Sequence, residues 1–222
     1  MLVWLASYPR SGSTYVRIVL NKAFALQTYS LHGAADERTF AARAGMLDLV
    51  GHRSGSVLGD ALIKEARASD KIYFIKTHEP PLTDDPAIYI VRDGRSAIVS
   101  YFHYYNEVEK VPITLENAIK GNLYAGSWSD HFHSWNPLER KATLFLRFED
   151  ITRNTNLLIN LLSNFCNISS NQDYDPSFSN FNKIFPEFFR SGRDKDNIAE
   201  ISPLIELFNE RHGALMSRLQ YS

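Results

Sequence analysis

Residues 7–15 carry the side chains best suited to chemistry in this sequence. The stretch Ser7-Tyr8-Pro9-Arg10-Ser11-Gly12-Ser13-Thr14-Tyr15 supplies one cation, one glycine and several hydroxyls directly before a helical pattern. The first N–H groups of a helix have no partner within the helix, and the helix dipole is positive there. Backbone amides, hydroxyls and the Arg10 guanidinium could therefore hold a phosphate or sulfate together. The stretch predicts an oxyanion-binding loop.

This loop departs from the pattern of nucleotide triphosphatases, G-x-x-x-x-G-K-[ST]. That pattern needs an earlier glycine, where this chain has Ala6 and Ser7, and a lysine directly after Gly12, where it has Ser13. An ordinary strand-to-helix turn rich in small residues is the alternative at this point. The rest of the chain has to decide between the two interpretations.

A second candidate group is Lys76-Thr77-His78, which follows a short apolar run. An ammonium group can stabilise charge at a transferring group, and an imidazole can take a proton near neutral pH. If the strands are parallel, these residues lie at the same sheet edge as the oxyanion loop. A lone histidine is more often structural than catalytic, so the interpretation of His78 depends on this context.

A third group joins Arg92, at the end of another apolar run, to Ser100 in the helical pattern that follows. A guanidinium and a hydroxyl roughly two helical turns apart could bind one phosphate. Arg95 has two possible roles, a contact to the same anion or an exposed ion pair with Asp93.

Four short apolar runs predict buried strands, as expected when both faces of a sheet are covered. They are residues 2–6, 72–75, 87–91 and 142–146. Helical patterns cover residues 14–26, 37–49, 58–68, 155–166 and 203–219. Another helical pattern follows Arg95, with Ala97 to Phe102 on its apolar side, and a further one carries Trp128 and His131 on one face. The alternation predicts an α/β fold with a central, mostly parallel sheet of at least four strands, helices on both faces and the oxyanion loop after the first strand.

The composition points to one globular domain, residues 1–222. Hydrophobic residues make up 44% of the chain, and no Pro/Gly/Ser-rich linker interrupts it. The formal net charge of -1 gives no reason to expect a nucleic-acid or membrane partner. One cysteine, Cys166, cannot form an intrachain disulfide. With no signal-peptide pattern at the start, we expect a cytoplasmic protein.

The three groups, in this order, resemble the motifs of the cytosolic-type sulfotransferases. That family usually reads Tyr-Pro-Lys-Ser-Gly-Thr-Thr-Trp at the loop, so Arg10, Ser13 and Tyr15 are replacements that keep the chemical type. Further resemblances lie at residues 126–135, 147–151, 176–178 and 188–193. The resemblance thus extends from Tyr8 to Gly192.

The resemblance implies sulfuryl transfer from 3'-phosphoadenosine 5'-phosphosulfate (PAPS), which leaves 3'-phosphoadenosine 5'-phosphate (PAP). His78 would be the catalytic base, with Lys76 and Arg10 at the transferring group. The residues implied in donor binding are Arg10, Ser11, Gly12, Ser13, Thr14, Tyr15, Arg92, Ser100, Phe148, Phe178, Arg190, Ser191 and Gly192. Phe148 and Ser191 replace a tyrosine and a lysine of the family, and Arg193 is a candidate to restore the charge lost at Ser191.

Two other classes stay open. A P-loop kinase would share the sheet and the loop, but it needs Mg²⁺ and an acidic ligand at a strand end, where this chain has Lys76 and Arg92. A nucleotide-binding protein without catalysis would have no need of His78. For the sulfotransferase we expect no metal and a small-molecule acceptor with a hydroxyl or amine. The sequence does not identify that acceptor or decide between a monomer and a homodimer.

Overall fold

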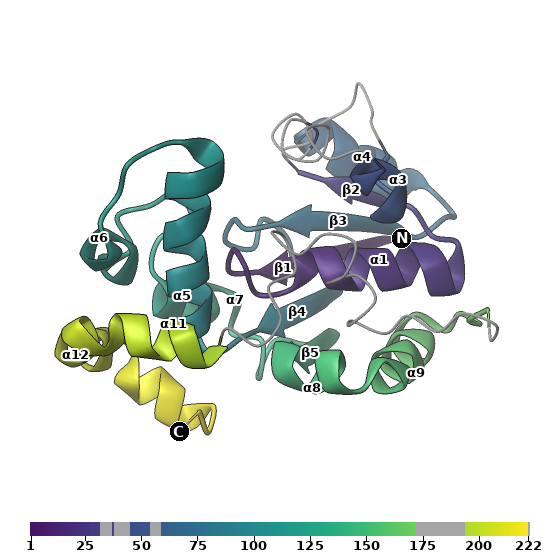
Figure 1. Ribbon diagram of the computed structural model, residues 1–222. Helices are drawn as coiled ribbons and strands as arrows, with labels where there is room; N and C mark the ends of the chain where they lie inside the picture. Colours follow the sequence, from purple (N-terminus) through teal and green to yellow (C-terminus); the bar gives the residue numbers. More distant parts are fainter. Residues whose placement is uncertain (32–36, 38–44, 54–58, 172–193, 222) are drawn as a thin grey trace.

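The computed structural model describes residues 1–31, 37, 45–53, 59–171 and 194–221. Its centre is a parallel sheet of five strands in the order β2-β3-β1-β4-β5 (Figure 1). The strands are β1 (Leu2–Ser7), β2 (Thr28–Ser30), β3 (Tyr73–Thr77), β4 (Ala87–Val91) and β5 (Thr143–Arg147). The predicted α/β class and the four predicted strands are confirmed.

The strand register brings the three candidate groups to one sheet edge. Ala6 of β1 pairs with Thr77 of β3 and with Tyr89 of β4, and Val91 of β4 pairs with Arg147 of β5. All four strands run in the same direction, so the residues that follow them emerge side by side. The oxyanion loop, His78 and Arg92 therefore share the carboxyl edge of the sheet, where ligands bind in open α/β folds.

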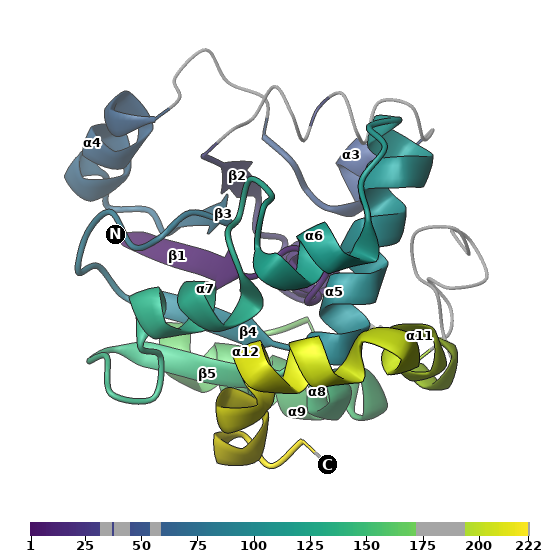
Figure 2. The same ribbon diagram turned by 90° about the vertical axis from the view of Figure 1, so that its left-hand side faces the viewer.

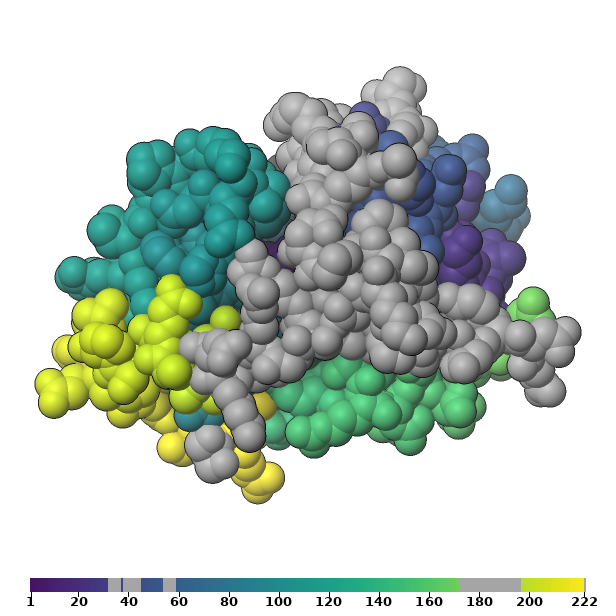
Figure 3. All heavy atoms as spheres, in the orientation of Figure 1, coloured from purple at the N-terminus to yellow at the C-terminus, as the bar shows by residue number. Residues whose placement is uncertain are grey.

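Helices cover both faces of the sheet. They are α1 (Ser13–Phe24), α3 (Met46–Leu49), α4 (Asp60–Ala68), α5 (Gly94–His103), α6 (Leu115–Lys120), α7 (Trp128–Trp135), α8 (Phe148–Arg153), α9 (Thr155–Cys166), α11 (Asp194–Ile201) and α12 (Ile205–Arg218). Figure 2 shows α5, α6, α7 and α12 in front of the sheet. In Figure 3, α11 and α12 lie beside the surface formed by residues 94–120, and α11 packs on α5.

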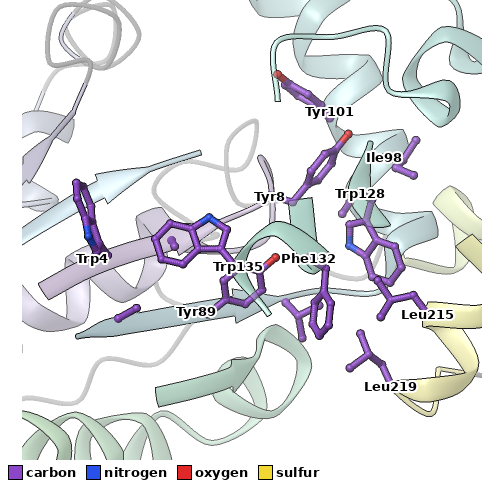
Figure 4. Close-up of a cluster of buried hydrophobic side chains, with 14 of the residues drawn as sticks. Trp4, Tyr8, Tyr89, Ile98, Tyr101, Trp128, Phe132, Trp135, Leu215 and Leu219 are labelled. Atoms are coloured by element: carbon purple, nitrogen blue, oxygen red, sulfur yellow. The ribbon is translucent and has the colours of Figure 1, made fainter. Parts of the chain in front are cut away.

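Alternating residues of the strands contribute their side chains to two separate hydrophobic cores, one on each face of the sheet. Trp4 and Tyr89 point to one face, where they pack with side chains of α5, α7 and α12 (Figure 4). Leu5 and Ile88 point to the other face and pack with side chains of α1 and α9. β1 and β4 are buried along their whole length, which explains their continuous apolar runs, whereas β5 is mostly half-buried.

Several elements differ from the sequence prediction. β2 was missed because Thr28-Tyr29-Ser30 is short and polar, and it lies at the edge of the sheet. The helix that begins at Gly94 continues into a π-helical segment, η1 (Tyr104–Glu109). The last helix is preceded by a 3-10 turn, η2 (Ser202–Leu204), so Ser202 and Pro203 lie outside α12. Most of the helix predicted over 37–49 falls outside the described residues.

Across the described part of the chain, no helix combines the length and the apolar character needed to cross a membrane.

Candidate active site

The oxyanion loop is a strained turn between β1 and α1. Arg10 has φ 64° and Gly12 has φ 107°, both in the left-handed region. Left-handed residues within such a turn direct successive N–H groups to one side, which makes a concave anion site. Among the described residues, no side chain caps the N-terminus of α1. The loop thus has the backbone form of an oxyanion cradle.

Gly12 also allows the Phe148 side chain to pack directly against the loop backbone. A Cβ atom at Gly12 would lie 2.4 Å from Cδ2 of Phe148, the residue that follows β5. No side chain fits in this space, and a positive φ already disfavours any residue but glycine. The Phe148 ring therefore forms one wall of the loop.

Three polar side chains, distant in sequence, meet at the loop. Arg10 Nε donates to Ser100 Oγ at 3.2 Å, and one terminal nitrogen of Arg92 donates to the Arg10 carbonyl at 3.1 Å. The Arg92 guanidinium also lies over the Phe148 ring, 4.7 Å from its centroid. The arrangement gathers two cations and a hydroxyl beside the N-terminus of α1, where an anionic ligand would neutralise them.

The serines and the tyrosine of the loop have different environments. Ser11 is fully buried, and its Oγ has no hydrogen-bond partner among the described residues. A buried hydroxyl without a partner is costly, and a phosphate oxygen would satisfy it. Tyr15 is buried at 1% exposure, and its hydroxyl lies 2.6 Å from Thr155 Oγ1. The role in donor binding that the resemblance implies for Tyr15 remains a prediction.

His78 lies directly after β3 with its ring fixed. Its Nδ1 lies 2.6 Å from the Ser7 carbonyl, the last residue of β1. A carbonyl can only accept, so Nδ1 carries the proton in this contact. In the neutral ring Nε2 is then the basic nitrogen, which is the form that a general base requires. Lys76 lies half-buried at the end of β3, two residues earlier.

The start of α5 is built around Asp93. Its carboxylate accepts from the backbone N–H of Arg95 and holds the Arg95 guanidinium through two nitrogens, the closest contact being 2.6 Å. The ion pair between Arg95 and Asp93 is present, but the Arg95 side chain is only 16% exposed, so the predicted exposed position is wrong. The carboxylate of Glu149 accepts from the Asp93 N–H at 2.9 Å, which ties this helix start to α8.

Tyrosines line the side of the loop that faces α5. The Tyr8 ring contacts Tyr101 edge-on at 5.6 Å, and Tyr101 contacts Tyr105 in the same way at 5.0 Å. Burial raises the pKa of the Tyr8 and Tyr101 hydroxyls, so both stay protonated. Tyr104 begins the π-helical segment and lies under the Arg10 guanidinium, 5.5 Å from it. Such π-helical turns occur frequently at functional sites.

Part of the predicted site cannot be located. Phe178, Arg190, Ser191 and Gly192 lie outside the described residues, as does Arg193. Within the described ranges, no group of three or more His, Cys, Asp or Glu side chains is arranged to hold a metal ion.

One further contact near the base could not be predicted from a local motif. Trp135 Nε1 of α7 donates to the carbonyl of Glu79, the residue after His78, at 2.8 Å. The motif at residues 126–135 was interpreted as structural packing, and the contact links positions 56 residues apart. A buried tryptophan needs a partner for its N–H, and this was the only available signal.

An anion cradle after the first strand of a parallel sheet, with cations from two strand ends, defines the class of P-loop-like phosphate-binding folds. The family described as the sulfotransferase domain matches residues 2–211. The chain belongs to this family.

Curated relatives support the same assignment. Rat sulfotransferase 1A1 is 28% identical over 165 residues, which cover 68% of this chain and 54% of the rat protein. Bovine sulfotransferase 1A1 is 30% identical over 162 residues, covering 66% and 52% respectively. Zebrafish cytosolic sulfotransferase 1 is 27% identical over 191 residues, covering 76% and 60%. The chain spans about half the length of the curated relatives it matches.

Solved structures support the fold. Mouse sulfotransferase SULT7A1, crystallised with PAP, superposes with a TM-score of 0.65 at 24% identity and covers 95% of this chain and 83% of its own. Retinol dehydratase, solved with androsterone and the inactive cofactor PAP, gives a TM-score of 0.56 at 19% identity, covering 89% and 69%.

Proposed function

We propose that this protein transfers a sulfuryl group from PAPS to a hydroxyl or amine of a small-molecule acceptor. The observation that carries the proposal is the meeting of Arg10, Ser100 and Arg92 at the loop, with His78 fixed at the neighbouring strand end. Cations near the ends of β1, β3 and β4 suit a donor with two anionic groups, a 5'-phosphosulfate and a 3'-phosphate. Membership of the sulfotransferase family also supports this proposed reaction.

The loop residues have the right chemistry for the two phosphate groups of such a donor. The backbone of Ser11 to Thr14 and the unpartnered Ser11 hydroxyl would bind the 5'-phosphosulfate, with Arg10 beside them. Arg92 and Ser100 would bind the 3'-phosphate. In the proposal, Phe178, Arg190, Ser191 and Gly192 complete the adenine and 3'-phosphate contacts, and Phe148 lines the loop.

The bound donor would supply an activated sulfuryl group. His78 Nε2 would take the proton of the acceptor as the acceptor oxygen or nitrogen forms its bond to sulfur. Arg10 and Lys76 would stabilise the negative charge that collects on the phosphate oxygen when its bond to sulfur breaks. Arg10 acts only by charge and hydrogen bonds, because a guanidinium does not give up its proton at neutral pH. PAP leaves with that electron pair.

The wider setting belongs to the same proposal. A small-molecule acceptor and a cytoplasmic location are supported by the likeness to cytosolic sulfotransferases. The tyrosines on the α5 side of the loop would face the acceptor, which favours a flat or apolar molecule. The alternatives are a kinase-like phosphotransferase and a nucleotide-binding protein without catalysis.

The test is transfer of labelled sulfate from PAPS to a panel of phenols, steroids and amines in the presence of a chelator. We expect turnover that does not change when Mg²⁺ replaces the chelator. Strict dependence on Mg²⁺, or transfer from ATP instead, would favour the kinase. Binding of PAP without transfer to any acceptor, and with equal PAP affinity in His78→Ala, would favour the non-catalytic protein.

A further inference from the structure

The inner side of α7 lies against the chain that carries the base. Trp135, 2% exposed, donates its indole N–H to the Glu79 carbonyl at 2.8 Å. The N–H of Glu79 donates to Thr77 Oγ1 at 3.0 Å, so the peptide groups on both sides of Glu79 are held. The backbone that leaves His78 is therefore fixed by a helix from another part of the chain.

His131 lies one helical turn before Trp135 on the same buried side of α7. Its Nδ1 lies 2.9 Å from the Tyr89 hydroxyl of β4, and its ring meets Tyr8 of the oxyanion loop edge-on at 6.0 Å. Figure 4 shows Tyr8, Tyr89 and Trp135 close together between α7 and the sheet. His131 thus contacts a strand beside the base and the loop that precedes Arg10.

The charge state of His131 suits a fixed structural contact. Burial lowers its pKa to about 3, and the backbone of His78 offsets part of this effect. Nε2 of His131 has no hydrogen-bond partner among the described residues. Trp135 therefore provides the stronger hold on the segment.

We propose that Trp135 and His131 are positioning residues for the base. Trp135 holds the backbone at Glu79, and His131 fixes α7 against Tyr89 and Tyr8 so that Trp135 can reach it. The His78 Nδ1–H then stays on the Ser7 carbonyl, and Nε2 remains the basic nitrogen. This inference rests on the proposed function, since only a transfer reaction needs a fixed tautomer at His78. If α7 served packing alone, any equal loss of packing on this helix would have the same effect on His78.

The experiment compares Trp135→Phe with Phe132→Leu. Trp135→Phe removes the indole N–H but keeps an aromatic ring, whereas Phe132 is a buried neighbour on α7 that packs on Tyr89 and Phe145. Nitrogen-15 NMR of histidine-labelled protein reports which ring nitrogen of His78 is protonated, and a His78→Gln sample assigns the signal. We expect His78 in Trp135→Phe to shift toward the Nε2-protonated tautomer, and His78 in Phe132→Leu to match the wild type.

Kinetics give a second readout with 4-nitrophenol as the probe acceptor. In Trp135→Phe we expect kcat to fall about tenfold to 100-fold, as misplaced catalytic groups do, with the KM for PAPS within about twofold. His131→Gln, which keeps an N–H donor, should retain more activity than His131→Phe.

Equal His78 spectra in Trp135→Phe and Phe132→Leu, at matched thermal stability, would overturn the inference. This NMR result needs neither donor nor acceptor, so it decides the inference even if 4-nitrophenol is not a substrate. PAP binding by the wild type tests the proposed function separately. If the wild type fails to bind PAP but Trp135→Phe shows the tautomer change, the proposed function is contradicted. The inference that α7 positions the His78 segment would still stand.

Discussion

The oxyanion loop (residues 7–15) and the base segment (residues 76–79) lie side by side at one sheet edge but are held in different ways. The loop takes its form from its own backbone, with left-handed residues at Arg10 and Gly12 followed by the start of α1. The base segment is held by partners from elsewhere, the Ser7 carbonyl and Trp135. The backbone conformation of the loop is thus mostly local in sequence, although Arg92 and Ser100 reach it from distant positions, whereas the orientation of the base depends wholly on tertiary contacts.

The comparison predicts that the two regions can be damaged separately, and His78 should give the largest effect. His78→Gln removes the base but no group that we assign to donor binding. We expect kcat to fall by about 10²–10⁴-fold, the usual contribution of a general base. The dissociation constant for PAP, measured by calorimetry, should change by less than about twofold. A fall in PAP affinity as large as the fall in kcat would show that the two regions are not separable.

Gly12→Ala should give the opposite pattern. The new methyl group would clash with Phe148. In addition, an alanine at this position would have to adopt a left-handed φ, which costs about 1–3 kcal/mol. We expect a lower melting temperature and at least about tenfold weaker PAP binding. Gly126→Ala is the matched control, because Gly126 has φ 69° and its added Cβ would meet no atom within 4 Å. Equal PAP affinity in the two variants would contradict the role of the Gly12–Phe148 contact.

Acid should destabilise the contact between α7 and the base segment. Above pH about 6.5, His131 is neutral in both the folded and the unfolded chain. Below that pH the unfolded chain takes up a proton, whereas the folded state resists it until its pKa of about 3. The free energy of unfolding should therefore fall by up to about 1.4 kcal/mol per pH unit in this window.

Urea unfolding between pH 6.5 and 4.5 measures this effect. His131→Gln cannot titrate, so its stability should fall less steeply than that of the wild type. An unchanged slope in His131→Gln would mean that His131 is protonated at its ordinary pH in the folded protein.

Arg10→Lys should give the smallest effect. Both side chains are cationic, and the loop backbone provides most of the anion contacts, so we expect kcat to fall by no more than about tenfold, or about 1.4 kcal/mol. Arg10 also bonds to Ser100 and lies over Tyr104, contacts that a lysine keeps only in part. A larger loss would show that the guanidinium has a role beyond its charge.

The sequence predicts the elements of the fold well where they are buried on both faces. β4 and α9 match their predicted ranges residue for residue, because an apolar run or a clear helical period defines each one. β2 and the π-helical turn at Tyr104 could not be predicted. The first is a polar edge strand, and the second keeps the periodicity of the helix before it.

The site shows the same limit. The loop, His78 and Arg92 were recognisable as local motifs, but the bond from Arg10 to Ser100 joins residues 90 positions apart. The contact between Trp135 and Glu79 also depends on how α7 packs on the sheet. Chemistry-bearing residues were therefore predictable from local patterns, whereas their partners required the tertiary structure.

Calorimetric titration with PAP in chelator, with ATP as the comparison, tests the central claim most directly. The arrangement of Arg10, Arg92 and Ser100 predicts that PAP binds at least about 100-fold more tightly than ATP, or about 2.8 kcal/mol. Such a result would establish the donor site and justify a wide search for the acceptor. Preference for ATP, or no binding of either nucleotide, would contradict the proposal that this protein is a PAPS-dependent sulfotransferase.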